Sequence, residues 1–260
     1  MRRIVCRLLC CCLLAFTTLS LWAAQRPTPP MPGATSTDPQ AVQAAVNILS
    51  ALGSSSGLVT VDATGIIESP GQDDGDFEIL AASPRTYRTV TTRGSESYTY
   101  LMNDGIGEVT INGKTRHIGG SEIMGARCPF IPFYSFVGEF ARPDVILAPT
   151  KAGTINGNPS VILTITDSDL SNPQYPIRST SEMEVDAKTW LPHRLRTQLI
   201  HSDNLEIVSH LEYVYDDYRL EGPYLLPHKI TLTVDGALAF TVTLNAFQFN
   251  VPANLTVAIP

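Results

Sequence analysis

The sequence predicts a mainly β protein of the α+β class, built on one long antiparallel sheet with a single apolar face. Three observations predict it. From about residue 178 onward, apolar and polar residues alternate in run after run, which places one set of side chains on each face of a sheet. Turn signals such as Asn156-Gly157 and Asp235-Gly236 separate these runs. One amphipathic helix precedes the strands, so a helix, another sheet or a ligand must cover the apolar face.

Residues 1–24 have the features of a secretory signal peptide. Three arginines precede an apolar stretch of 15 residues, and Ala23-Ala24 offers a small-residue cleavage point. An uncleaved membrane anchor is one alternative, although a spanning helix needs roughly 20 residues. A lipidated cysteine is another, although Cys10 to Cys12 have almost no apolar run before them. We therefore expect export to the periplasm or cell envelope.

The rest of the chain is expected to be a proline-rich linker over residues 25–37 and a single domain over residues 38–260. The whole chain has a net charge of −7, and the first 24 residues carry three arginines, which leaves −10 for the remainder. An acidic domain without basic clusters argues against nucleic acid as a partner. Cys128 is the one cysteine beyond the signal peptide, so no intramolecular disulfide is predicted.

The helix is predicted to begin at Asp38 and to end at Gly53. Asp38 is a favourable N-cap residue, Pro39 suits the first helical position, and glycine commonly ends helices. Polar residues fall on the other faces of this helix. We expect its apolar face to lie on the sheet, through Val42, Ala45, Val46, Leu49 and Leu52.

About eleven strands are predicted, with the alternation shifting by one residue at Ala246-Phe247, as at a β-bulge. The segment Leu191–Leu195 recurs as Leu226–Ile230, with Leu-Pro-His at the start of both. Each copy is predicted to lie where one strand ends and the next begins.

Residues 119–150 interrupt the strand pattern with closely spaced aromatic residues, prolines and glycines. The part from Pro132 to Ala141 has room for one or two helical turns. Because this segment is apolar nearly all round, we expect it to be buried or to cover an apolar cavity. Two interpretations stay open: the aromatic residues complete the core, or they form a lid over a lipid-sized cavity. They are compatible, since a lid packs as core in the empty protein.

No catalytic or metal-binding motif occurs beyond the signal peptide, so no catalytic residue, metal or cofactor is predicted. The histidines lack the short spacing of a zinc site. His193 and His228 each follow a proline and are expected to be solvated turn residues. Glu184 is expected to be a solvating residue on the polar face of its strand. The acidic segment Gln72–Asp76 lacks the spacing of a calcium loop and predicts a hairpin turn.

Two turn segments and the order of elements point to a known family. The first segment is Asp186–Pro192, which ends in Leu-Pro, and the second is Tyr218–Pro227, which begins with Tyr-Arg and also ends in Leu-Pro. They follow a signal peptide, an amphipathic helix, a strand meander and an apolar insert. In this plan, over roughly residues 38–250, the chain resembles the LolA/LolB-like family of bacterial envelope proteins. That family includes lipoprotein carriers and a periplasmic stress-sensor domain.

The resemblance implies a half-open antiparallel β-barrel, with the helix and a short helical insert on the concave side. It implies no enzymatic activity and no cofactor. It implies instead an apolar cavity for a lipid or lipoprotein acyl chain, with the protein acting as carrier or sensor and an envelope protein as a further partner. By position in this plan, the cavity and lid residues are Val42, Val46, Leu49, Phe130, Phe133, Tyr134 and Phe136.

Three other function classes remain open at this stage. A transmembrane β-barrel would also show alternating strands, but the chain lacks a terminal aromatic residue, aromatic girdles and long loops. An enzyme with a site assembled from scattered residues would show a perturbed carboxylate or histidine inside the cavity. A structural envelope module with a self-filled core would bind protein through its sheet edge.

Overall fold

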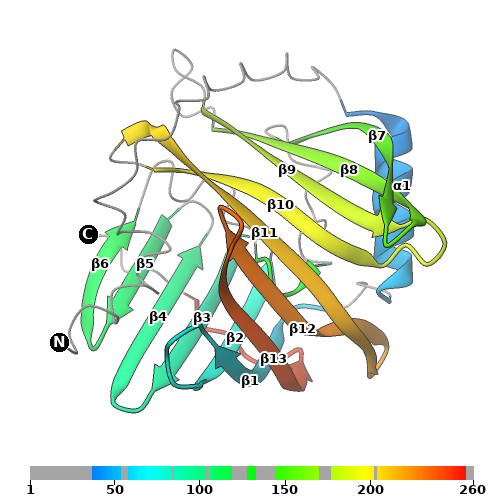
Figure 1. Ribbon diagram of the computed structural model, residues 1–260. Helices are drawn as coiled ribbons and strands as arrows, with labels where there is room; N and C mark the ends of the chain where they lie inside the picture. Colours follow the sequence, from blue (N-terminus) through cyan, green and yellow to red (C-terminus); the bar gives the residue numbers. More distant parts are fainter. Residues whose placement is uncertain are drawn as a thin grey trace.

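The computed structural model describes one helix and thirteen strands (Figure 1). The predicted signal peptide and nearly all of the predicted linker lie outside the described residues. The same holds for the candidate lid residues Phe133, Tyr134 and Phe136. The described residues are 37–53, 58–83, 85–103, 106–118, 128–132, 145–169, 177–201 and 204–255.

All thirteen strands belong to one antiparallel sheet, in the order β6-β5-β4-β3-β2-β1-β13-β12-β11-β10-β9-β8-β7. Two meanders, β1 to β6 and β7 to β13, join where β1 pairs with β13. The strands are β1 (Val61–Glu68), β2 (Gly75–Ser83), β3 (Thr86–Arg93), β4 (Glu96–Asn103), β5 (Ile106–Ile111), β6 (Lys114–Ile118), β7 (Val145–Ile155), β8 (Asn158–Asp169), β9 (Ile177–Asp186), β10 (Pro192–His201), β11 (Asn204–Glu221), β12 (Tyr224–Val234) and β13 (Ala237–Phe249).

The described strands number thirteen, which corrects the expected count of about eleven. The extra strands come from the first meander, where β3 is rich in threonine and arginine and β6 is mostly polar. Neither shows the alternation of apolar and polar residues on which the sequence-based count depended. Hydrogen bonding to their neighbours, and not the apolar pattern, defines these two strands.

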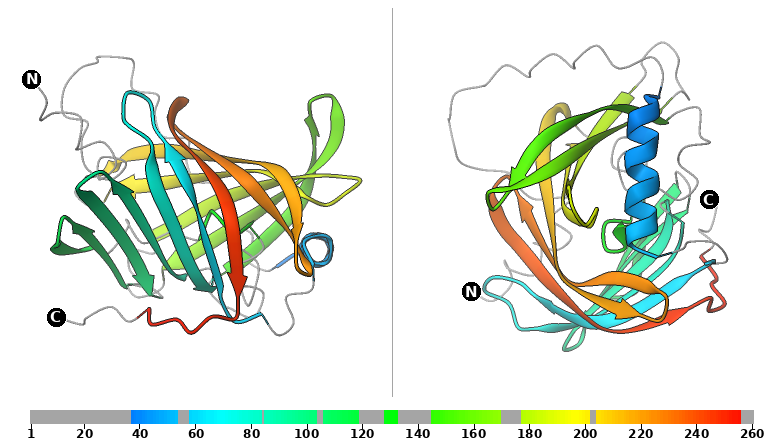
Figure 2. Two further views of the ribbon diagram at one scale, coloured as in Figure 1. Left: turned by 90° about the horizontal axis from the view of Figure 1, so that it is seen from below. Right: turned by 90° about the vertical axis from the view of Figure 1, so that its right-hand side faces the viewer.

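The sheet curves into an open half-barrel, and its concave face is apolar (Figure 2). Inward side chains from both meanders form one continuous hydrophobic core, and Ile79, Leu163, Met183 and Val242 are each at most 1% exposed. Burying each such side chain contributes about 1.5–3 kcal/mol to folding. The predicted one-sided sheet, with its apolar face covered, is therefore confirmed.

Helix α1 (Pro39–Ala51) packs against β7 and β8 and is held at both ends. The Asp38 side chain accepts hydrogen bonds from the backbone N–H groups of Gln40 and Ala41, at 2.8 and 3.1 Å. The Asp38 N–H donates to the Leu147 carbonyl of β7, and the Leu52 carbonyl accepts from Leu225 N–H of β12, both at 2.9 Å. The helix therefore runs from β7 to the start of β12 (Figure 2).

The predicted bulge near Ala246 is present. Thr64 of β1 pairs with Ala246, but the next residue, Gly65, pairs with Leu244. Asn245 is therefore the extra residue in β13, and after it the odd-numbered Phe247 and Phe249 pack against the core. An extra residue of this kind shifts the alternation by one position.

The two Leu-Pro-His segments lie at different places in their strands. The first agrees with the prediction, because β10 begins at Pro192. The second does not: the turn is earlier, at Gly222-Pro223, and β12 begins at Tyr224. Gly222 has a positive φ of 59°, which glycine adopts without a steric penalty. His228 therefore lies inside a strand and is only 2% exposed, so the expected solvated turn residue is wrong.

Candidate functional site

The centre of the concave face is occupied by Phe130, which comes from the short segment Cys128–Pro132. Its ring centroid lies 4.9 Å from that of Phe77 on β2, 6.2 Å from Phe240 on β13 and 6.4 Å from Tyr213 on β11. Phe130 is 7% exposed. One side chain from the insert thus contacts both meanders across the concave face, and we call these four rings the central aromatic cluster.

The candidate residues on the helix are only partly on its buried face. Val42 and Leu49 are partly buried against the core, whereas Val46 is 46% exposed. The buried face of α1 is formed by Ala41, Ala44, Ala45, Ile48 and Leu52. This face is displaced by roughly a quarter of a turn from the predicted one.

The expectation that Val46 lies on the buried face is therefore wrong. The physical reason is that three alanines give the helix a narrow side, which can approach the sheet more closely than a side with valines can. A ligand-binding role for Val42, Val46 and Leu49 stays a prediction.

Buried tyrosines on the concave face were not among the predicted site residues. The ring centroid of Tyr87 lies 6.0 Å from that of Tyr100, and Tyr215 of β11 is 1% exposed. Burial raises the pKa of both Tyr87 and Tyr215 well above the usual value for tyrosine. Their phenols are neutral at every physiological pH and can donate a hydrogen bond.

Cys128 belongs to the same buried surroundings, because a negative charge on its thiolate would raise the pKa of both Tyr87 and Tyr215. It is fully buried. Burial raises the pKa of the Cys128 thiol to about 12, although backbone N–H groups of Ile131 and Phe130 act in the opposite direction. A thiol with this pKa is not a nucleophile near neutral pH, so Cys128 is a packing residue, as its position beside Pro129 suggests.

His228, on β12, is a further polar residue on the concave side of the sheet. Its ring packs edge-on against Phe247, with centroids 5.1 Å apart. Its Nε2 lies 3.0 Å from Glu221 Oε1, within ion-pairing distance, but neither ring nitrogen makes a hydrogen bond with any described residue. The sequence carried one signal for this position: two residues before Ile230, it continues the alternating pattern of β12.

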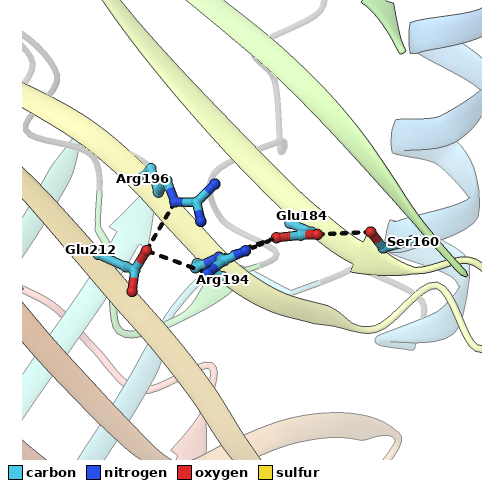
Figure 3. A network of polar contacts seen from close by, with 5 residues as sticks. All are labelled: Ser160, Glu184, Arg194, Arg196 and Glu212. Carbon is cyan, nitrogen blue, oxygen red and sulfur yellow. Dashed lines mark hydrogen bonds and ion pairs between the residues drawn. The ribbon is translucent and has the colours of Figure 1, made fainter. Parts of the chain in front are cut away.

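The convex face carries a polar network that runs across β8, β9, β10 and β11 (Figure 3). Ser160 Oγ donates to Glu184 Oε1 at 2.7 Å, and Arg194 donates to Glu184 Oε2, through Nε at 3.1 Å and also through Nη2. Glu212 Oε2 then lies 3.5 Å from Arg194 Nη1 and 2.8 Å from Arg196 Nε. The network ties four neighbouring strands together.

Glu184 is 3% exposed, so the expectation that it is a solvating residue is wrong. The space for its carboxylate comes from Gly153 on β7, where an added Cβ would lie 2.6 Å from Ser160 Oγ and 3.0 Å from Glu184 Oε1. Burial alone would raise the pKa of Glu184, but the hydrogen bonds from Ser160 and Arg194, with the charge of Arg194, lower it overall. The ionised carboxylate is thus the stable form in the folded protein.

The convex face also has two shallow hollows beside polar side chains. One, of about 470 Å³, is lined by residues that include Glu182, Arg196 and Glu212. The other, of about 390 Å³, lies over β1, β2 and β3. Across the described ranges, no three His, Cys, Asp or Glu side chains are grouped closely enough to hold a metal ion. No helix in the described part of the chain is long and apolar enough to cross a membrane.

Comparison with known proteins identifies the fold. No protein-family model matches the sequence, and no curated protein matches it. A solved LolA superfamily protein from Nitrosomonas europaea matches 81% of this chain and 94% of its own, with a TM-score of 0.50 and 10% sequence identity. The chain has a LolA-like fold. A DUF1329 family protein from Desulfovibrio piger matches 85% of this chain and 96% of its own, with a TM-score of 0.53 and 12% identity.

The expected resemblance to LolA/LolB-like proteins is therefore confirmed at the level of fold. Identities of 10% and 12% describe a shared LolA-like architecture and not a shared activity.

Proposed function

We propose that this LolA-like chain is a non-enzymatic protein of the cell envelope that binds an acyl chain of a lipid or lipoprotein on its concave face, as a carrier or a sensor. The observation that carries the proposal is the apolar concave face, with Phe130 placed across it by a segment that belongs to neither meander. Burial of the hydrocarbon chain would stabilise the complex by about 25 cal/mol for each Å² of apolar surface removed from water.

In this proposal Phe130 holds the place of the ligand in the empty protein. A buried phenylalanine contributes about 3–5 kcal/mol to stability. A twelve-carbon acyl chain offers more, because burial of each CH₂ group contributes about 0.8 kcal/mol before the costs of ordering the ligand are subtracted. The chain can therefore displace Phe130 from the central aromatic cluster. When the ligand leaves, Phe130 returns, and the protein never exposes a large apolar surface to water.

A second candidate is a structural or protein-binding envelope module with a self-filled core. Phe130 favours it too, because a 7% exposed ring with three aromatic neighbours is what a finished core contains. The two candidates differ in what happens when a lipid is offered. A self-filled core excludes the acyl chain, whereas a place-holding Phe130 yields to it.

Native mass spectrometry of the protein, purified without detergent, separates the two. The acyl-binding proposal predicts a discrete added mass that organic extraction removes and that fragments as a lipid. A clean mass that does not change after incubation with phospholipid and an acylated peptide would contradict acyl binding and favour the self-filled module. Leu238→Ala, at a 51% exposed position, is the matched control and is expected to carry the same added mass.

A further inference from the structure

Two buried polar side chains on the apolar concave face have unused hydrogen-bonding capacity among the described residues. They are the Tyr215 hydroxyl, on a residue that is 1% exposed, and the His228 imidazole, on a residue that is 2% exposed. Among the described residues, no side chain or backbone group is hydrogen-bonded to Tyr215 Oη or His228 Nδ1, and the one contact of His228 Nε2 is Glu221 Oε1, 3.0 Å away in the ion pair. Buried polar groups in folded proteins are nearly always paired, and unpaired ones are often kept for a function.

These two groups are close neighbours on one wall of the half-barrel. Tyr215 of β11 is paired directly with Ile230 of β12. His228 lies two residues before Ile230, on the same face of the strand. Side chains in this diagonal relation are about 7–8 Å apart at most between their Cβ atoms. The two side chains therefore start from neighbouring positions on the same wall of the half-barrel.

The wall that carries Tyr215 is next to the central aromatic cluster. Tyr213 belongs to that cluster, with its ring 6.4 Å from Phe130, and it precedes Tyr215 by two positions on β11. Phe130 belongs to the segment Cys128–Pro132, so this segment packs against the wall through Tyr213. If a ligand displaces this segment, Tyr215 is therefore among the first polar groups that it meets.

We infer that Tyr215, with His228 beside it, anchors the carbonyl oxygen of a neutral acyl ester or amide. This inference rests on the proposed acyl-binding function and names the chemical class of its ligand. The Tyr215 hydroxyl donates to one lone pair of the carbonyl oxygen, and an N–H group of the His228 imidazole donates to the other. The acyl chain then extends over the central aromatic cluster, where Phe130 lies in the empty protein.

The surroundings favour a neutral carbonyl group over a free carboxylate. Glu221 lies within ion-pairing distance of His228, and Asp217 is near enough to feel the charge of His228. A ligand carboxylate placed here would be a third acidic group beside these two side chains. Burial of an unpaired negative charge in an apolar interior adds a further penalty. An ester or amide carbonyl carries neither cost.

The test is ligand competition on the full chain, with methyl laurate, tetradecane and laurate each displacing a bound apolar fluorescent dye. Methyl laurate and tetradecane are nearly equal in length, and only the first has a carbonyl group. We expect the wild type to bind methyl laurate about tenfold more tightly than tetradecane. Tyr215→Phe, which removes one hydroxyl, is expected to abolish that preference and leave tetradecane binding unchanged.

Two more variants make the result specific. His228→Leu is expected to weaken methyl laurate binding selectively, in the same direction as Tyr215→Phe. Tyr98→Phe is the control, because the Tyr98 hydroxyl already donates to Glu96 at 3.2 Å on β4. Because Tyr215→Phe removes an unpaired buried group, its melting temperature is expected to equal or exceed that of the wild type.

Three different results would overturn acyl binding, the carbonyl anchor and the neutral head group, respectively. If the wild type binds neither methyl laurate nor tetradecane, the proposed acyl-binding function fails, and the inference fails with it. If both bind but Tyr215→Phe weakens neither, or weakens both equally, acyl binding stands and the carbonyl anchor is overturned. If laurate binds more tightly than methyl laurate, the neutral head group is overturned.

Discussion

Replacing Phe130 with alanine is expected to destabilise the empty protein and to strengthen ligand binding at the same time. Phe130 is 7% exposed and has three aromatic neighbours with centroids 4.9 to 6.4 Å away. Removal of a buried phenylalanine ring costs about 3–5 kcal/mol. The variant leaves space that an acyl chain can fill without displacing a side chain, so its dissociation constant for methyl laurate should fall.

Urea unfolding of wild type and Phe130→Ala, each with and without methyl laurate, measures both effects. The variant's free energy of unfolding should be lower by about 3–5 kcal/mol without ligand. A ligand at a hundred times its dissociation constant stabilises a protein by about 2.7 kcal/mol, and at one fixed concentration the tighter-binding variant should gain more than the wild type. Leu238→Ala, the exposed control, should change stability by less than about 0.5 kcal/mol. Loss of ligand binding in a folded Phe130→Ala protein would refute the place-holding role of Phe130.

Three further predictions concern the polar network on the convex face, and urea unfolding checks each. Arg194→Ala should lower the free energy of unfolding by about 3–5 kcal/mol because it removes the positive partner of the buried Glu184 carboxylate, whereas Arg196→Ala, at a more exposed position, should cost less than about 1 kcal/mol. The folded pKa of Glu184 is lowered from its ordinary 4.5, so the ionised carboxylate stabilises the folded protein fully above that pH, and this contribution is lost as the pH falls through the folded pKa. Glu184→Gln should remove this part of the pH dependence of the free energy of unfolding. The same pH dependence in the variant and the wild type would contradict the prediction. Gly153→Ala should cost about 1–3 kcal/mol, since its Cβ would lie 2.6 Å from Ser160 Oγ; a variant as stable as the wild type would show that the network adjusts freely.

The sheet could be predicted because alternation of apolar and polar residues follows directly from strand geometry. The bulge at Asn245 was visible for the same reason, since the phase of alternation changes there. The strands β3 and β6 were missed because most of their residues are threonine, arginine, lysine or histidine, which leaves too few apolar residues to show an alternation. For α1, the predicted face followed the larger Val42, Val46 and Leu49, whereas the buried face includes the small Ala41 and Ala44, which the prediction left out.

Parts of the candidate site depend on distant positions that a local pattern does not reveal. His228 is buried because the turn before β12 is at Gly222-Pro223 and not at its own Leu-Pro step. Glu184 on β9 is buried because Gly153 on β7, two strands away, has no side chain and leaves room for the carboxylate. Phe130, by contrast, was predicted as a cavity residue by its position in the plan of the LolA/LolB-like family. The structure brings it together with the inward aromatic residues of three strands.

Photo-crosslinking with a methyl ester that carries a diazirine along its acyl chain locates the bound chain on the protein. After irradiation and proteolysis, mass spectrometry locates the labelled residues. Acyl binding on the concave face predicts label on inward residues such as Tyr213, Phe240 and Val242, and competition by methyl laurate. Label on outward residues such as Glu212 and Thr241, or no label that methyl laurate can suppress, would contradict the account.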